Sequence, residues 1–211
     1  MKTKHSLTSL VLATTLVAGL GLTTARGDVA PAETPAPAAA DTSVGQGLLG
    51  QVYGELTYSY IDLDVGSGHA DDYHFALNQP LAFGLDGFLS YDFVDFNAGH
   101  QNIVMAGLRP FSTRFNWGKP YLEAGAGYAW TSGDNSFVWE VAVGAEFQVN
   151  PVTTITPYVQ FADAPDLAGD GTWNFGVKGN YWVNSQWAVT AGVELDDDEN
   201  VGFTVGTNFR F

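Results

Sequence analysis

The sequence contains no cysteine and few basic residues, and each absence narrows the class of protein. Without cysteine the chain can form neither a disulfide framework nor a cysteine-ligated metal site, and lipid attachment to an N-terminal cysteine is excluded. Only 8 Lys and Arg stand against 23 Asp and Glu, which gives a formal net charge of −15. A chain of this sign repels phosphates, so nucleic acid is excluded as a partner, whereas divalent cations and basic molecules are favoured.

Beyond the N-terminal region, the sequence also lacks any apolar run of the length that a transmembrane helix requires. Residues 1–27 combine a basic start, an apolar stretch and the small residues Ala25 and Gly27. This arrangement predicts a secretory signal peptide that is cleaved before Asp28. Residues 28–46 are rich in alanine and proline and show no periodicity, which predicts a disordered periplasmic tail.

The remaining residues, 47–211, predict a single all-β domain. Apolar residues alternate with small or polar ones along most of this region, and most alternating stretches are long enough to cross a membrane as tilted strands. Alternation is weak in 87–96 and 101–111, so a count of eight strands stays open beside a count of ten. The predicted strands are 51–63, 73–83, 87–96, 101–111, 119–131, 137–149, 153–163, 172–183, 186–196 and 200–211.

The last predicted strand, 200–211, alternates up to its final residue. The residues from Val201 to Phe211 at odd positions are mostly large and apolar, whereas those at even positions, including Arg210, are small or polar. A strand that closes a barrel in lipid needs every backbone group paired, because each unpaired group in hydrocarbon costs several kcal/mol. The pattern therefore favours a barrel-closing strand over a frayed chain end.

The distribution of tryptophan, acidic residues and proline indicates a membrane barrel rather than a water-soluble one. All six tryptophans fall near predicted strand ends, as expected for side chains that prefer the headgroup interface; Trp117, Trp182 and Trp187 share one rim. That rim also holds most prolines and both ends of the domain, so we assign it to the periplasm. The links at the other rim are acidic: 65–72, 97–100, 132–135, 164–171 and 196–199.

The signal peptide, the strand series and the terminal phenylalanine resemble the small bacterial outer-membrane β-barrel group, which includes opacity-type porins and OmpA-like transmembrane domains. The resemblance implies a closed antiparallel transmembrane β-barrel that is integral to the outer membrane and in contact with its lipid and lipopolysaccharide. It also implies a monomer that the barrel-assembly machinery inserts through the C-terminal strand. Ten strands would exceed the eight that are usual in that group.

Charged residues on the predicted inner face form a candidate lumenal charge network. Its excess of acids favours cations if the lumen conducts, whereas side chains can also fill a barrel of this size. Because 200–211 has to pair with 51–63, we expect Arg210 to pair with Glu55 near the periplasmic rim. We expect Glu140 to lie high in the lumen, unpaired and close to the outer loops. The candidate residues are Glu55, Glu123, Glu140, Glu146, Lys178 and Arg210.

A run of carboxylates at the outer rim predicts a divalent-cation site. Carboxylate oxygens are the hard ligands that Ca²⁺ and Mg²⁺ prefer, and such a density of like charge needs bridging. The sequence suggests no other cofactor. The residues of this candidate site are Asp196, Asp197, Asp198 and Glu199.

A second group at the outer rim keeps an enzymatic alternative open. Protease-type outer-membrane barrels use aspartate pairs and an Asp–His pair at this rim, and lipid A-modifying enzymes share the architecture. The group consists of His69, Asp71, Asp72, His74 and His100. Its spacing matches no catalytic motif, so we assign no catalytic residue. The sequence therefore predicts a structural or surface-interaction protein, or a small and weakly cation-selective pore.

Overall fold

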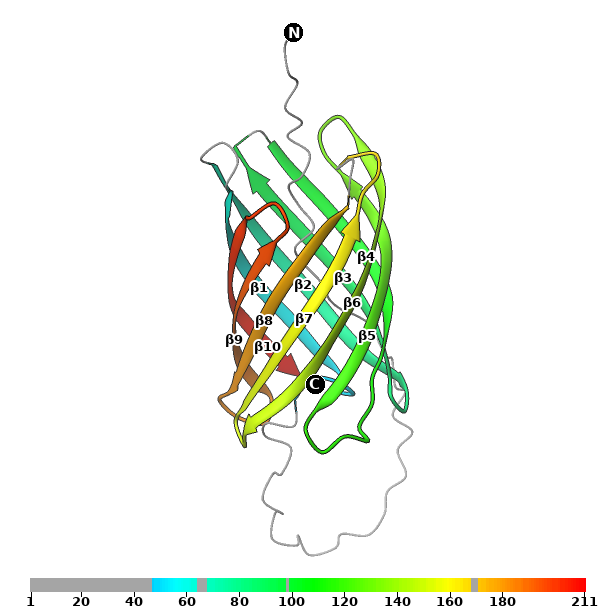
Figure 1. The fold of residues 1–211 in the computed structure, drawn as a ribbon, viewed down its shortest axis with the longest axis vertical. Coiled ribbons are helices and arrows are strands. Elements are labelled where there is room, and N and C mark those ends of the chain that lie inside the picture. Colours follow the sequence, from blue (N-terminus) through cyan, green and yellow to red (C-terminus); the bar gives the residue numbers. More distant parts are fainter. Residues whose placement is uncertain (1–46, 64–67, 98, 168–170) are drawn as a thin grey trace, which may run out of the picture.

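The computed structural model describes residues 47–63, 68–97, 99–167 and 171–211, and these residues form ten β-strands (Figure 1). No helix within these ranges is long and apolar enough to cross a membrane. The predicted signal peptide and tail, residues 1–46, lie outside the described residues. The strands are β1 (Tyr53–Leu63), β2 (Gly68–Ala82), β3 (Leu85–Phe96), β4 (Gly99–Pro110), β5 (Lys119–Trp130), β6 (Asn135–Asn150), β7 (Thr153–Asp163), β8 (Thr172–Trp182), β9 (Trp187–Asp196) and β10 (Val201–Arg210).

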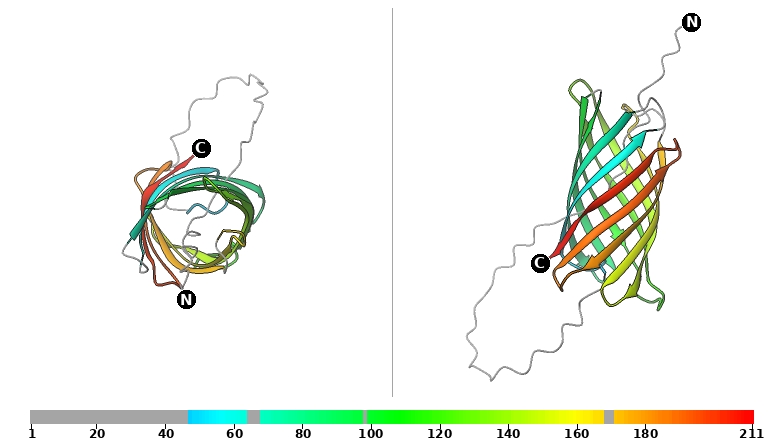
Figure 2. Two further views of the ribbon diagram at one scale, coloured as in Figure 1. Left: turned by 90° about the horizontal axis from the view of Figure 1, so that it is seen from above. Right: turned by 90° about the vertical axis from the view of Figure 1, so that its left-hand side faces the viewer.

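The sheet closes into a barrel. Each strand pairs antiparallel with the next strand in the chain, and β10 returns to pair with β1. The closing ladder runs from the pair of Tyr53 and Arg210 to the pair of Asp62 and Val201. Seen from above, the strands form a continuous ring, and the side view shows them inclined to the barrel axis (Figure 2). The predicted ten-strand antiparallel barrel is therefore confirmed, and the eight-strand alternative is wrong.

The two ends of the barrel differ in their connections. The lower rim, at the bottom of Figure 1, contains the start of β1, the end of β10 and the links that follow β2, β4, β6 and β8. The upper rim contains the ends of β1, β3, β5, β7 and β9. Towards the lower rim, the ladder between β4 and β5 is interrupted. It ends at Leu108 and Ala124, and pairing resumes as an isolated bridge between Phe111 and Tyr121.

Side chains alternate between the exterior and the lumen along the strands. On the outside, large apolar side chains such as Leu122 and Val205 are more than half exposed (60% and 57%). On the inside, polar side chains such as Thr190 and Asn208 are buried. A water-soluble barrel buries its apolar face, whereas an apolar exterior around a polar interior suits a lipid environment.

The largest difference from the predicted boundaries lies at the start of β2, which begins at Gly68 rather than at residue 73. The predicted acidic loop 65–72 is therefore wrong for its second half, which pairs with β1. Within this paired stretch Asp72 turns into the lumen and Asp71 turns outward, where its Oδ1 accepts a hydrogen bond from the hydroxyl of Tyr58 (2.5 Å). Acidic residues thus extend the strand instead of ending it.

Trp182 also departs from its predicted place at the lipid interface, because its side chain lies in the lumen and is 1% exposed. It shares the inner face of β8 with Asn180. The guanidinium of Arg210 lies 3.5 Å from the centroid of its ring, so a cation–π contact replaces the expected headgroup contact. Trp130, Trp173 and Trp187 are exposed on the outside, as predicted for an interfacial girdle.

Candidate functional site: the lumen of the barrel

Charged side chains gather inside the barrel, where carboxylates outnumber bases. They reach the lumen because every second residue of a strand points to the same face. The residues predicted for the charge network all lie on inner faces, and further charged residues join them there. The lumenal carboxylates are Glu55, Asp72, Asp86, Asp92, Glu123, Glu140, Glu146 and Glu194, and the bases are Arg109, Lys119, Lys178 and Arg210.

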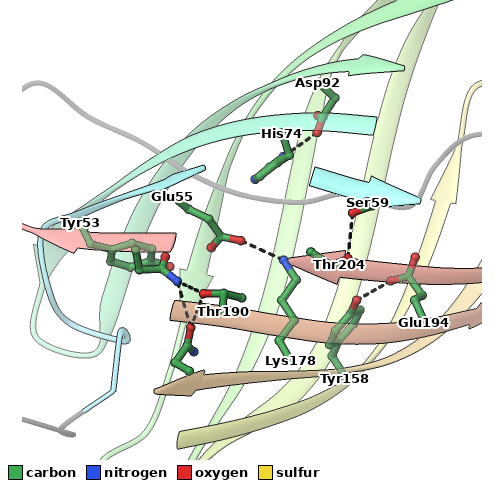
Figure 3. A network of polar contacts seen from close by, with 12 residues as sticks. Tyr53, Glu55, Ser59, His74, Asp92, Tyr158, Lys178, Thr190, Glu194 and Thr204 are labelled. Atoms are coloured by element: carbon green, nitrogen blue, oxygen red, sulfur yellow. Dashed lines mark hydrogen bonds and ion pairs between the residues drawn. The ribbon is translucent and has the colours of Figure 1, made fainter. Parts of the chain in front are cut away.

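Ion pairs join different strands within the lumen. Nζ of Lys178 on β8 lies 3.1 Å from Oε1 of Glu55 on β1 (Figure 3). Arg109 on β4 pairs with Glu123 on β5, and both side chains are buried. The sequence predicts Arg210 as the partner of Glu55, but the structure gives Glu55 a different one. The register explains the difference, because it places Arg210 opposite the first residue of β1, two residues below Glu55.

Other carboxylates in the lumen have neutral partners. Nε2 of Gln160 on β7 donates a hydrogen bond to Oε2 of Glu140 on β6 (2.5 Å), and Glu140 is 1% exposed. We expected Glu140 to lie unpaired near the loops. Among the described residues it has no ion-pair partner, but it is buried and bonded to an amide, because β6 begins at Asn135 and carries Glu140 down into the barrel. The hydroxyl of Tyr158 on β7 likewise donates to Glu194 on β9 (Figure 3).

The group considered for catalysis is divided between the two faces of the wall. Nδ1 of His74 lies 2.5 Å from Oδ1 of Asp92 inside the barrel, where both residues are buried (Figure 3). Asp72 shares this inner face. The other members are on the outside, where the ring of His69 stacks on Tyr60 and that of His100 on Phe93. The arrangement therefore does not bring the five residues into one site.

Residues Gly47–Gln51, which we call the N-terminal segment, lie inside the lower end of the lumen. Leu48 and Leu49 are buried, and Leu48 packs in one cluster with Tyr53 and Trp182. The blue segment inside the ring in Figure 2 (left) follows this path. Sequence reasoning missed this position, because a short glycine- and leucine-containing stretch before a strand is equally compatible with a surface turn.

Side chains from the barrel wall bind the backbone of the N-terminal segment. Their strands, β2, β3, β5, β6 and β10, lie on several sides of the lumen. The bonds run from Leu48 N to Glu146 Oε2 (2.5 Å), from Gly50 N to Asp86 Oδ2 (2.9 Å), from Lys119 Nζ to Leu49 O (3.0 Å), from Asn78 Nδ2 to Gln51 O (2.6 Å) and from the Arg210 guanidinium to Gly47 O. Nζ of Lys119 also lies 3.2 Å from Oε1 of Glu146, so two of the side chains that bind the segment form an ion pair with each other.

Above the N-terminal segment, the lumen contains a cavity of about 70 Å³ that both charged and apolar side chains line. Its walls include the ion-paired residues described above and the rings of Tyr53, Tyr121 and Tyr158. A cavity of this size holds a few water molecules. The cavity is therefore a local widening in a lumen that its own side chains largely fill.

Several buried polar atoms of the lumen have no protein hydrogen-bond partner within the described part of the chain. They occur at different heights, and examples are Thr57 Oγ1, Ser90 Oγ, Glu140 Oε1 and Thr154 Oγ1. Leaving such an atom dry costs about 1–3 kcal/mol. Because the cost would recur along the lumen, we infer that water enters it.

The upper part of the lumen also contains apolar clusters, a feature that sequence reasoning missed. One cluster contains Ile61, Ala70 and Val94 from β1, β2 and β3. A second contains Ile103, Met105, Ala129, Val138, Ala162 and Ala164. Each strand residue in these clusters occupies a position that the alternating pattern assigns to the inner face. The alternation could therefore have predicted that these apolar residues lie in the lumen.

The candidate cation site at the upper rim is shaped by hydrogen bonds within its loop. Oδ1 of Asp196 accepts from the backbone N–H groups of Asp198 (3.0 Å) and Asn200 (2.9 Å). Oδ1 of Asp197 accepts from the backbone N–H of Trp173 (3.0 Å). Among the described residues, no three acidic or histidine side chains are grouped so as to hold a metal ion. Cation binding by 196–199 stays a prediction.

A closed antiparallel barrel with an apolar exterior and a polar interior defines the class of this protein. Every strand pairs with a neighbouring strand on both sides, so the sheet has no edge strand exposed to lipid. The fold is that of an integral transmembrane β-barrel protein.

Comparisons with known proteins found similar solved structures but no family. No protein-family model matches the sequence, and no match was found among curated proteins. A structure of the KdgM porin in complex with disordered oligogalacturonate is 8% identical, covers 76% of this chain and 99% of the porin, and gives a TM-score of 0.46. Omp33 of Acinetobacter baumannii is 13% identical (76% and 98% covered, TM-score 0.39), and Neisserial surface protein A is 12% identical (76% and 96% covered, TM-score 0.39). At such identities and scores, none of the three carries information about the function of this chain.

Proposed function

We propose that the lumen is a narrow, water-containing pathway that prefers small cations. The observation that carries this proposal is the set of buried lumenal polar atoms that need water, in a lumen where carboxylates outnumber bases. Negative charge that its surroundings do not fully neutralise attracts cations and repels anions. The pathway is narrow because tyrosine rings and the N-terminal segment occupy much of it.

The proposal places the protein in the outer membrane as a monomer, with the lower rim in the periplasm. The exposed apolar side chains of the wall contact lipid, and the acidic links of the upper rim lie at the level of lipopolysaccharide. The barrel-assembly machinery inserts the chain through β10. Gel filtration in detergent and outer-membrane fractionation test the monomer and its location.

Electrical recording on refolded protein in planar bilayers tests the proposed pathway. Under a KCl gradient, we expect a small conductance whose reversal potential shows a preference for K⁺. Glu140→Gln removes one lumenal charge and keeps a side chain that can bond to Gln160, so it should lower the cation preference. Asp134→Asn removes the same charge from an exposed link and is the matched control; it should leave the preference unchanged. Anion selectivity would refute the proposal.

A structural or surface-interaction role is the second candidate function. It is favoured by the ion-paired and largely filled lumen, which can serve to stabilise a barrel that does not conduct. This role would replace the pore if bilayers remained silent both with the unchanged protein and with variants that loosen the N-terminal segment. The upper-rim links would then be the surface to probe for partners.

A further inference from the structure

The N-terminal segment is attached to the barrel by side chains and takes no part in its strand ladders. The segment itself forms a turn, in which the N–H of Gln51 donates to the carbonyl of Leu48 (3.1 Å), and Val52 connects it to β1. The barrel closes without it, because the β1–β10 ladder starts at Tyr53. Release of the segment therefore leaves the wall intact.

Gly47 allows the segment to approach its main anchor. Its φ of +81° lies in the left-handed region that favours glycine. A Cβ at this position would lie 1.9 Å from Oε1 of Glu146, which is far inside van der Waals contact. The anchored arrangement therefore depends on the absence of a side chain at residue 47.

We propose that Gly47–Gln51 is a gate that closes the lower end of the lumen and that its release opens the cation pathway. This inference rests on the proposed function and adds its regulation. Glu146 and Asp86 hold the gate closed, because they bind the backbone of the segment. Both carboxylates also face the lumen and so line the proposed pathway. When the segment leaves, the space that it occupies at the lower end of the lumen opens to the pathway.

Two variants with opposite expected effects test the gate by conductance. Glu146→Ala removes the acceptor of the Leu48 N–H and should raise the open fraction about tenfold, the equivalent of about 1.4 kcal/mol. Glu194→Ala removes a lumenal carboxylate that is bonded to Tyr158 and should lower cation current. If charge alone governed conduction, both variants would lower it. A decrease with Glu146→Ala therefore overturns the gate.

Glycine variants provide a second matched pair. Gly47→Ala forces a side chain against Glu146 and should open the pathway, as Glu146→Ala does. Gly133→Ala, at a position in an upper-rim link where an added Cβ meets nothing within 4 Å, should conduct like the unchanged protein. Equal currents from Gly47→Ala and the unchanged protein would contradict the proposal.

Thiol labelling follows the segment independently of current. The chain has no cysteine, so Leu49→Cys introduces a single thiol at a buried position. We expect slow reaction with a membrane-impermeant maleimide, and reaction at least about tenfold faster when Gly47→Ala is added. Fast labelling of Leu49→Cys alone shows that the segment does not close the lumen, and the gate fails while the pore can stand. Fast labelling confined to the double variant, with silent bilayers throughout, refutes the pore and with it the gate.

Discussion

The ion pair of Lys178 and Glu55 allows the energetics of the lumen to be tested by a double-mutant cycle. The two groups approach to 3.1 Å across strands that are not neighbours, since β10 and β9 lie between β1 and β8. The carboxylate side is 4% exposed and the lysine side chain 20% exposed, next to the cavity. Removing the lysine and removing the carboxylate should therefore lower the free energy of unfolding by different amounts.

Lys178→Met leaves a deeply buried carboxylate without its ion-pair partner. Breaking a dry buried pair costs about 3–5 kcal/mol, and we reduce this to about 2–3 kcal/mol because the cavity admits water. Glu55→Gln leaves an ammonium that the cavity can hydrate, so we expect a smaller cost of about 1–2 kcal/mol. The double variant buries no unpaired charge and should lose less stability than the sum of the two.

Urea unfolding in phospholipid vesicles, followed by tryptophan fluorescence, measures the three free energies of unfolding. We expect a coupling of about 1.5 kcal/mol or more between the sites. Additive costs, or a larger cost for Glu55→Gln than for Lys178→Met, would refute the view that this pair stabilises the lumen as a partly hydrated ion pair.

Three further changes have expected outcomes. Gly127→Ala would place a Cβ 1.9 Å from a carbonyl oxygen of β4 and should cost about 1–3 kcal/mol in the same urea assay, whereas Gly179→Ala meets no atom nearer than 3.8 Å and should be mild. The N–H of Phe211 donates to the carbonyl of Val52, just before β1 (3.1 Å). Deleting Phe211 should therefore impair assembly of the barrel, measured as a change in gel migration on heating, more than deleting residues 28–43. The reverse order would contradict this. Millimolar Ca²⁺ should raise the thermal stability of the protein, and replacing the four acids of 196–199 with Asn and Gln should abolish this gain. If Ca²⁺ does not change the stability of the unchanged protein, the proposed cation site is refuted.

The strand order and the polarity of the faces were predictable because alternation depends on local sequence alone. In β6, residues from Phe137 to Val143 at odd positions face outward, as their pattern indicates. The same rule also reveals Trp182 as an inward residue, since it shares parity with Asn180. The preference of indole for the interface is an average tendency, and the cation–π contact with Arg210 outweighs it here.

Contacts across the lumen were not predictable, because they depend on the register and on the curvature of the closed sheet. Arg210 and Glu55 are near each other in the paired strands, yet the long side chain of Lys178 reaches Glu55 from β8. The placement of Gly47–Gln51 likewise requires anchors from five strands at once. No stretch of sequence encodes such a site, since its members come together only when the barrel closes.

The interrupted ladder between β4 and β5 gives the wall a seam. Backbone pairing stops at Leu108 and resumes at Phe111, and the gap contains Arg109 and Pro110 on β4 opposite Glu123 and Leu122 on β5. Arg109 and Glu123 form an ion pair there. Their ion pair fastens two strands that backbone bonds do not hold there. Amide protons beside this seam, such as that of Leu122, should exchange with solvent through small local openings, while the uninterrupted ladders exchange only in larger ones. The β6–β7 ladder has a similar gap between Gly144 and Phe147. A cylinder without an edge thus retains places where it can part sideways towards the bilayer.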